Sequence, residues 1–174
     1  MALAVCLLFD ARGERAMCRL WDRLEENGVP SLRSHTHGRH VPHFSYAVLR
    51  SWQLDDVRAA VDALSSNGPV EFSFDGLGTF RRGRTWLIPA LTSDVAFRQE
   101  RVVEAVRAAG AELHRNYVPG AWIPHCTLAP RVQLTALSVV AAAVYDVLPL
   151  RARADHAALI DSGTGERWPL RGLP

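Results

Sequence analysis

The sequence contains no lysine, because all 20 of its basic residues are arginine. This absence excludes every mechanism that needs a lysine ammonium, including the Walker-A phosphate loop, the lysine Schiff base and the adenylated lysine of ATP-driven nucleic-acid ligases. Anions must therefore be recognised by arginine, histidine, hydroxyl or backbone N–H groups. The 18 acidic residues leave a net charge of only +2, which fits a small anionic ligand better than a dedicated duplex-DNA binder.

Cysteine and long apolar runs are also scarce. Cys6, Cys18 and Cys126 are odd in number and form no C-x-x-C pair, so we expect neither disulfides nor structural zinc. The apolar residues 1–9 fall far short of the roughly 20 residues that span a membrane, and they carry no basic leader. They predict a buried strand. We expect a cytoplasmic protein with no membrane contact and no obligate protein partner.

A length of 174 residues with 48% apolar residues predicts a single domain over residues 1–174. Hydrophobic periodicity and Gly/Pro signals predict helices at residues 11–27, 55–64, 93–110 and 134–145. Strands are predicted at residues 1–9, 43–49, 85–91 and 125–128, from residue 70 to the glycines Gly76 and Gly78, and as a pair within 148–170 around the turn 161–165.

The order of these elements predicts an α+β fold. The strands between residues 70 and 91 are joined by a short arginine-rich turn, which indicates antiparallel pairing, and strict strand–helix alternation is absent. A loop, a strand and a helix follow one another twice, around His43 and around His125. We therefore expect two pseudo-symmetric lobes of antiparallel sheet with outer helices, meeting at a central cleft.

Two short segments, Pro42-His43-Phe44-Ser45-Tyr46 and Pro124-His125-Cys126-Thr127-Leu128, share one pattern 82 positions apart. Side chains at i and i+2 of a strand point to the same face, so His43 would lie beside Ser45 and His125 beside Thr127. A single H-x-[ST] match arises by chance about once in such a chain. The shared proline, loop and strand at both sites predict a common functional role.

Two imidazoles at one cleft suit a reaction that deprotonates a nucleophile and protonates a leaving oxygen in the same step. Transfer at a phosphodiester needs such a pair. The hydroxyls of Ser45 and Thr127, together with arginine, would meet the charge of the phosphate oxygens without a metal ion or another cofactor.

These residues carry a resemblance to a known family. The chain resembles the two-histidine (2H) phosphoesterase superfamily, in its 2'-5' RNA ligase or RNA 2',3'-cyclic phosphodiesterase-like branch, from the first strand to about Arg131. Beside the two motifs, Gly76-Leu77-Gly78-Thr79-Phe80 and the Trp86-Leu87 strand are similar to the family's intervening segment. The resemblance implies His43 and His125 as catalytic residues, and an RNA end or nucleotide 2',3'-cyclic phosphate as substrate, with ATP-independent 2'-5' ligation as the reverse chemistry.

The chain departs from the family pattern at three positions. Ser45 stands where threonine is usual, which keeps the hydroxyl, Tyr46 stands where leucine is common, and Pro130 separates the second motif from Arg131. We expect Arg131 to contact the phosphate and Arg39 or His40 to touch the substrate. Phe80, in the turn after the glycines, is expected to stack on a base.

Other readings remain open at this point. The run His35, His37, His40 and His43 has metal-ligand character, which would make the protein a histidine-cluster metallohydrolase, or it is a solvated loop beside the cleft. The arginines of residues 81–84 would grip the phosphates of a longer RNA, or form a solvated tip. A third alternative is a non-catalytic module that binds RNA ends without turnover.

Overall fold

The computed structural model describes residues 2–174, so Met1 of the predicted first strand lies outside the described part. The strands are β1 (Leu3–Phe9), β2 (His43–Ser51), β3 (Val70–Phe80), β4 (Arg84–Pro89), β5 (Glu112–Leu113), β6 (Cys126–Ala129), β7 (Leu150–Asp161) and β8 (Arg167–Pro169). The helices are α1 (Ala11–Glu26), α2 (Leu54–Asp62), α3 (Ser93–Ala108) and α4 (Leu137–Tyr145), with short 3-10 turns at Arg115–Tyr117 and Leu134–Ala136.

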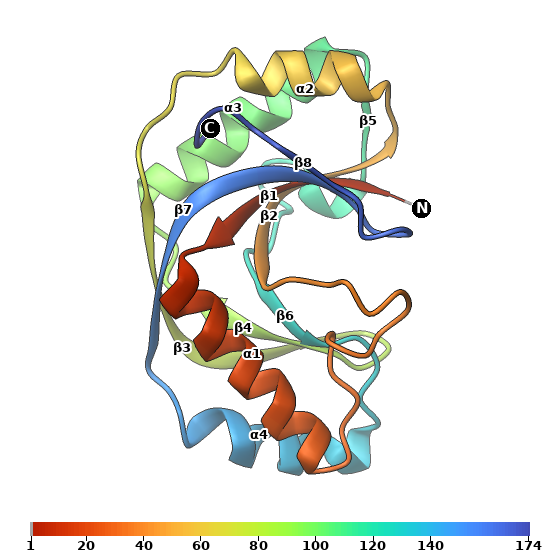
Figure 1. Ribbon diagram of the computed structural model, residues 1–174, viewed down its shortest axis with the longest axis vertical. Coiled ribbons are helices and arrows are strands. Elements are labelled where there is room, and N and C mark those ends of the chain that lie inside the picture. Colours follow the sequence, from red (N-terminus) through yellow and green to blue (C-terminus); the bar gives the residue numbers. More distant parts are fainter. Residues whose placement is uncertain (1) are drawn as a thin grey trace.

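All strands belong to one antiparallel sheet in the order β5-β2-β1-β7-β3-β4-β6, with β8 paired to β7. The long strand β7 joins two halves of this sheet, because its beginning pairs with β3 and the remainder pairs with β1. One lobe therefore contains β5, β2 and β1, and the other contains β3, β4 and β6 (Figure 1). The predicted α+β class with two antiparallel lobes is confirmed.

Each long helix packs on the lobe opposite to the strand that precedes it. Helix α1 follows β1, yet Trp21 donates its indole N–H to the carbonyl of Thr127 in β6 at 3.3 Å. Helix α3 follows β4, and the amide of Gln99 donates to the carbonyl of Tyr46 in β2 at 3.2 Å. Figure 1 shows the result, with α2 and α3 at one end of the molecule and α1 and α4 at the other. This exchange of helices ties the two lobes together.

The two halves of the chain repeat each other closely. Helices α1 and α3 have 16 residues each, and α3 starts and stops 82 positions after α1. Helices α2 and α4 have nine residues each. The same 82-residue interval separates His43 from His125, so both histidines occupy equivalent places in the two lobes.

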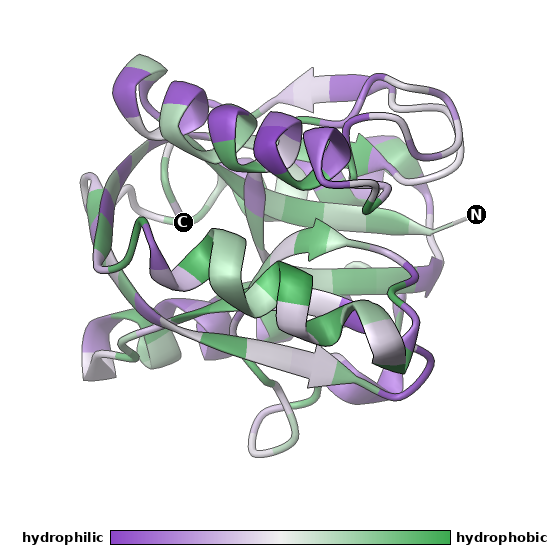
Figure 2. Cartoon of the chain, turned by 90° about the horizontal axis from the view of Figure 1, so that it is seen from below, coloured by the Kyte–Doolittle hydropathy of each residue, from purple (hydrophilic) through white to green (hydrophobic). Residues whose placement is uncertain are grey.

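The core lies between the sheet and the helices. Strand β1 is almost entirely buried, and α1 turns Met17, Leu20, Trp21 and Leu24 inward. In Figure 2 hydrophobic residues follow the inner strands, while hydrophilic residues gather on the outer faces of helices. None of the helices within residues 2–174 is both long and apolar enough to cross a membrane.

Two local predictions need correction, and one strand, β5, was not predicted. Strand β3 does not end at Gly76 or Gly78 but continues to Phe80, because Gly78 pairs with Trp86 and leaves room for the indole ring. His125 precedes β6, which begins at the next residue. The short strand β5 has only two residues, too few to produce a recognisable alternation in the sequence.

Candidate active site

The two histidine motifs, far apart in the sequence, lie side by side in the structure. Trp122, just before the second motif, donates its indole N–H to the carbonyl of Ser45 in the first motif at 3.2 Å. Its ring meets Phe44 edge to face, with centroids 5.5 Å apart. The side chain of Cys126, next to His125, is buried, as the strand alternation predicts.

Both histidines contact the backbone carbonyl of the residue two positions earlier in the chain. Nδ1 of His43 lies 2.8 Å from the carbonyl oxygen of Val41, and Nδ1 of His125 lies 2.7 Å from that of Ile123. A carbonyl only accepts, so each Nδ1 carries the proton and each neutral ring keeps an unprotonated Nε2. In both cases a proline separates the carbonyl from the histidine and favours an extended conformation before it. Each imidazole therefore presents a proton acceptor at Nε2.

The surroundings of the two imidazoles favour their neutral forms. Burial, above all, lowers the pKa of His43; the bond to the Val41 carbonyl opposes this, and the nearby cation of Arg84 lowers the pKa further. For His125 burial again dominates, and the charges of His43 and Arg84 contribute to a pKa of about 4. Each histidine is thus within electrostatic reach of the same guanidinium, and His125 also senses a charge on His43.

Two adjacent cavities lie at the two histidines, one at each of them. The larger, of about 580 Å³, contains His125, and its walls include Phe80, Arg81, Arg84, Tyr117 and Arg131. The smaller, of about 250 Å³, contains His43 together with His35, Thr36, His40, Arg84 and Thr127. Arg84 lines both cavities, so its side chain lies at their junction.

The charge of this double cavity differs from that of the whole chain. Among residues 2–174 no carboxylate lines either cavity, although the chain carries almost as many acids as arginines. A still larger cavity of about 810 Å³ lies elsewhere, and its walls include Glu14 and Asp155. The acid-free double cavity is therefore the better site for a phosphate-containing ligand.

The arginine-rich turn between β3 and β4 is pinned against the segment after β6. The backbone N–H of Val132 donates to the carbonyl of Gly83 at 2.7 Å. A Cβ at Gly83 would clash with the Val132 backbone, and the φ of +74° also favours glycine there. This contact holds Arg84 and Arg131 at one cavity. The side chains of Arg81, Arg82 and Arg84 are exposed, so phosphate contact and a solvated tip both stay predictions for this turn.

Phe80 lies against the second histidine. Its ring stacks on Trp86 with centroids 4.8 Å apart and meets the imidazole of His125 edge to face at 5.1 Å. Trp86 itself lies 5.7 Å from the same imidazole. The two aromatic rings therefore hold the imidazole of His125 in place. Phe80 also lies on the cavity wall, and its stacking on a base stays a prediction.

The two motif hydroxyls lie in different surroundings. Thr127 lines the smaller cavity. Ser45 is buried, its Oγ lies 3.4 Å from the thiol sulfur of Cys6, and it lines neither cavity.

The structure does not bring Arg39 to the cleft. Its guanidinium donates to the carbonyl of Thr164 in the turn between β7 and β8, and the residue lines neither cavity. Sequence reasoning also missed His114 and Asn116, which lie on the wall of the larger cavity. They belong to no motif, and only the tertiary contact of β5 with β2 brings this segment to the cleft.

The histidine run does not form a metal site of the usual kind. The ring of His40 lies 5.9 Å from that of His35, nearly parallel to it, and 4.1 Å from that of His37. Such rings lie face to face instead of aiming their nitrogens at one point. Within the described part of the chain, no three His, Cys, Asp or Glu side chains are placed to hold a metal ion.

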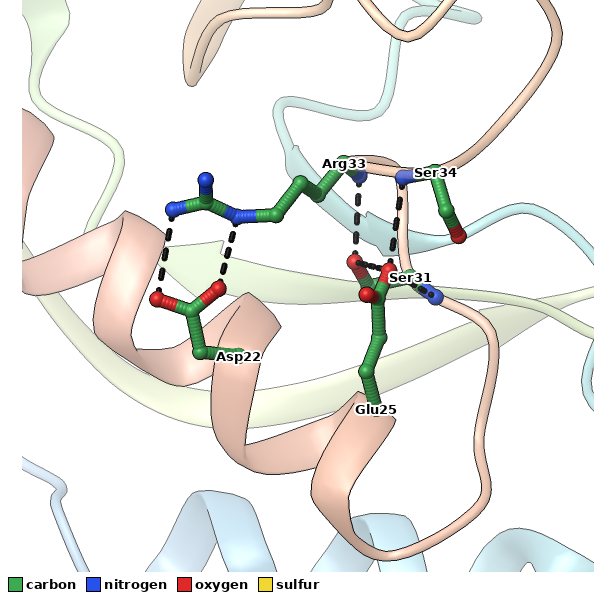
Figure 3. Close-up of polar contacts among 5 residues, drawn as sticks. All are labelled: Asp22, Glu25, Ser31, Arg33 and Ser34. Atoms are coloured by element: carbon green, nitrogen blue, oxygen red, sulfur yellow. Dashed lines mark hydrogen bonds and ion pairs between the residues drawn. The ribbon is translucent and has the colours of Figure 1, made fainter.

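The loop that carries these histidines is anchored on α1 (Figure 3). Arg33 forms an ion pair with Asp22, with 2.7 Å between Nε and the carboxylate oxygen. Glu25 accepts a hydrogen bond from the hydroxyl of Ser31 at 2.6 Å and another from the N–H of Ser34 at 3.3 Å. The Ser31 hydroxyl is the main cause of the lowered pKa of Glu25.

Paired imidazoles at the meeting point of two antiparallel lobes are the arrangement of the two-histidine phosphoesterases, a class of enzymes with phosphodiesterase-type function. The sequence profile of the 2'-5' RNA ligase superfamily matches residues 13–166. The chain belongs to this superfamily. No curated protein sequence matches it.

Solved structures with the same fold are distant in sequence. LigT of E. coli in its apo form has 12% identity and a TM-score of 0.62, covering 98% of this chain and 94% of LigT. The protein TT0787 of Thermus thermophilus has 18% identity and a TM-score of 0.60, covering 99% of both chains. Usb1 of Kluyveromyces marxianus, solved with uridine monophosphate, has 13% identity and a TM-score of 0.51, covering 97% of both chains.

Proposed function

We propose that the protein is a metal-independent phosphodiesterase that opens the 2',3'-cyclic phosphate at the end of an RNA or nucleotide. The observation that carries this proposal is the matched pair His43 and His125, each with Nδ1 bound to a backbone carbonyl, which leaves Nε2 as the atom for proton transfer. Run in reverse with a 5'-hydroxyl in place of water, the same groups would join RNA ends by a 2'-5' bond without ATP.

In hydrolysis, the Nε2 atom of one neutral histidine removes a proton from water as the water oxygen bonds to phosphorus. The bond from phosphorus to one ribose oxygen breaks, and the other histidine, in its protonated form, donates a proton to that oxygen. The products are a phosphate monoester and a free ribose hydroxyl. Protons are conserved over the cycle, because the two histidines exchange protonation states and return to the starting state through solvent.

The electrostatics of the cleft suit this step. Both histidines are neutral in the free protein, because burial and Arg84 lower the pKa values of both. A bound phosphodiester anion opposes the charge of Arg84 and raises the pKa of the histidine nearest to it. Substrate binding would therefore supply the protonated partner that the reaction needs. Arg84 and the hydroxyl of Thr127 would meet the charge on the non-bridging oxygens.

The cyclic phosphate fits the remaining features of the site. The larger cavity combines arginines with the aromatic rings of Phe80 and Tyr117, as expected for a ligand with both a phosphate and a base. Structures with this fold include LigT with 3'-AMP and Usb1 with uridine monophosphate. Both ligands are nucleoside monophosphates, which supports a nucleotide end as the ligand of this chain.

The direct test is incubation of the protein with nucleoside 2',3'-cyclic phosphates, with and without chelator. We expect a nucleoside monophosphate as product in both conditions. His43→Ala and His125→Ala should each lose most of the turnover, and the double variant little more, because the two groups act in one step. Binding without product at any pH would instead indicate a non-catalytic RNA-end module. Activity lost in chelator would indicate the metallohydrolase.

A further inference from the structure

The proposed reaction leaves three histidines of the α1–β2 loop without a role. His35, His37 and His40 form a stack of imidazoles beside the catalytic residue His43. Figure 1 shows this loop, in orange, along the open side of the molecule between the two lobes. His35, Thr36 and His40 line the smaller cavity together with Arg84. We call His35, Thr36 and His40 the histidine wall.

The histidine wall is held in place by specific contacts. The Thr36 hydroxyl and Nε2 of His40 are 3.0 Å apart, and Thr36 has a φ of +49°, which is rare for a β-branched residue. The β7–β8 turn supports the loop from outside, because Arg39 donates to the carbonyl of Thr164 and Gly165 lies directly against His37. The loop is thus packed on a neighbouring element as well as on α1.

Every charged or titratable group that faces the histidine wall is basic. His40 faces His35, His37 and His43, and burial together with these neighbours lowers its pKa to about 4. His35 faces Arg84 and Arg131 as well as His37, and burial and these cations lower its pKa too. Among the described residues no carboxylate lines this cavity. The wall is therefore a cluster of potential cations that lacks a counter-ion.

We propose that the histidine wall is a second phosphate subsite, which binds the phosphate next to the scissile one in an oligonucleotide. This inference rests on the proposed function and narrows it from nucleotides in general to RNA ends of at least two nucleotides. The smaller cavity, of about 250 Å³, has room for a phosphate group and adjoins the larger one, with which it shares Arg84 and Pro130. A ligand with two phosphates can then place one at the catalytic pair and the other at His35 and His40.

Phosphate binding at such a wall must be linked to protons. An anion next to His35 and His40 supplies the missing opposite charge and raises their pKa values, so binding draws protons from solvent. A mononucleotide has one phosphate, held by His43, Thr127 and His125, and would place no second anion against His35 and His40. Selection for a second phosphate should therefore grow as the pH falls from about 8 to about 6.

The test compares two stable ligands by calorimetry, a nucleoside 3'-phosphate and a dinucleotide with a 3'-phosphate. Titrations in two buffers of different ionisation enthalpy give the number of protons taken up. The parent should prefer the dinucleotide by about tenfold or more near pH 6, as expected for one or two charge-assisted hydrogen bonds. It should also take up more protons with the dinucleotide than with the mononucleotide.

In the variant His35→Asn/His40→Asn, both the dinucleotide preference and the extra proton uptake should disappear. The single variants His35→Asn and His40→Asn, each expected to lose part of the preference, test the subsite if the double variant does not fold. His156→Asn is the matched control, because this histidine is exposed on β7 and lines neither of the two cavities. It should keep both properties of the parent.

Two results would overturn the subsite: equal affinity of the parent for both ligands, or a preference that persists in the folded histidine variants. Neither ligand needs to be turned over, so these measurements are independent of catalysis. A parent that leaves all 2',3'-cyclic phosphates intact refutes the proposed reaction, and calorimetry still decides whether the wall binds a second phosphate.

Discussion

Substitution of Gly78 by alanine tests how the catalytic imidazole of His125 is positioned. Gly78 in β3 pairs with Trp86 in β4, and the indole ring covers its α-carbon. An added Cβ would lie 2.5 Å from Cη2 and 2.6 Å from Cε2 of Trp86, whereas ordinary contacts begin at 3.4 Å. The indole must therefore retreat by roughly 1 Å, a shift large enough to disturb a packed interior.

This movement would pass directly to the active site. Trp86 stacks on Phe80, and both rings contact His125. A catalytic group displaced by about 1 Å typically costs on the order of 10²-fold in rate. Overpacking of this kind also lowers the free energy of unfolding by about 1–3 kcal/mol. We expect Gly78→Ala to show both effects, measured as kcat on a nucleoside 2',3'-cyclic phosphate and as the thermal unfolding midpoint.

Gly28→Ala provides the matched control. Gly28 has a φ of +75°, and no atom lies within 4 Å of the position of an added Cβ. Alanine there costs about 1–2 kcal/mol for the left-handed backbone and moves no aromatic ring. This control should lose stability and keep the parent's kcat. The reasoning is refuted if Gly78→Ala turns over substrate as fast as the parent, or if Gly28→Ala loses as much activity.

Four further predictions concern charge and hydroxyl groups. Because the pKa values of both catalytic histidines are lowered in the free protein, kcat/KM should follow a bell-shaped pH profile with its maximum below the ordinary histidine pKa. Arg84→Gln removes a cation that lowers both values, so the bell should move to higher pH and fall by about 10²-fold; an unmoved profile would contradict the assigned place of Arg84. Ser45→Ala and Thr127→Val should each slow turnover by about 10²- to 10³-fold with unchanged circular dichroism, and parent-like rates would limit these hydroxyls to packing. Glu25→Gln should cost about 1 kcal/mol at neutral pH, after allowance for the partial exposure of the carboxylate. The lowered pKa of Glu25 means that its contribution is present above the unfolded-state pKa and is lost as the pH falls through the lower folded-state value. Parent and variant should therefore have the same thermal midpoint in strong acid, and a difference that survives there would point to packing instead of charge.

Predictions from local pattern agree with the structure where the pattern itself is strong. The helix predicted at residues 11–27 differs from α1 by one residue, because an apolar face at three- and four-residue spacing and the side-chain cap of Asp10 are local features. Alternation along β6 correctly separates Cys126, which is buried, from Thr127, which reaches a cavity. The end of β3 was predicted wrongly at Gly76 and Gly78, because the glycine at 78 makes room for Trp86 of the next strand and does not mark a turn.

The local sequence pattern also predicts the two histidine motifs and the two similar lobes, because the same order of loop, strand and helix recurs after 82 residues. The pattern does not show how the two lobes contact each other. Arg84 at the junction of both cavities, Arg39 bound to the opposite side of its loop, and the His35–His40 wall all depend on contacts between segments far apart in the chain. Such contacts form only when the whole sheet packs against the helices of both lobes. A hydrophobic period or a motif spacing, in contrast, indicates only which face of its own helix or strand a side chain occupies.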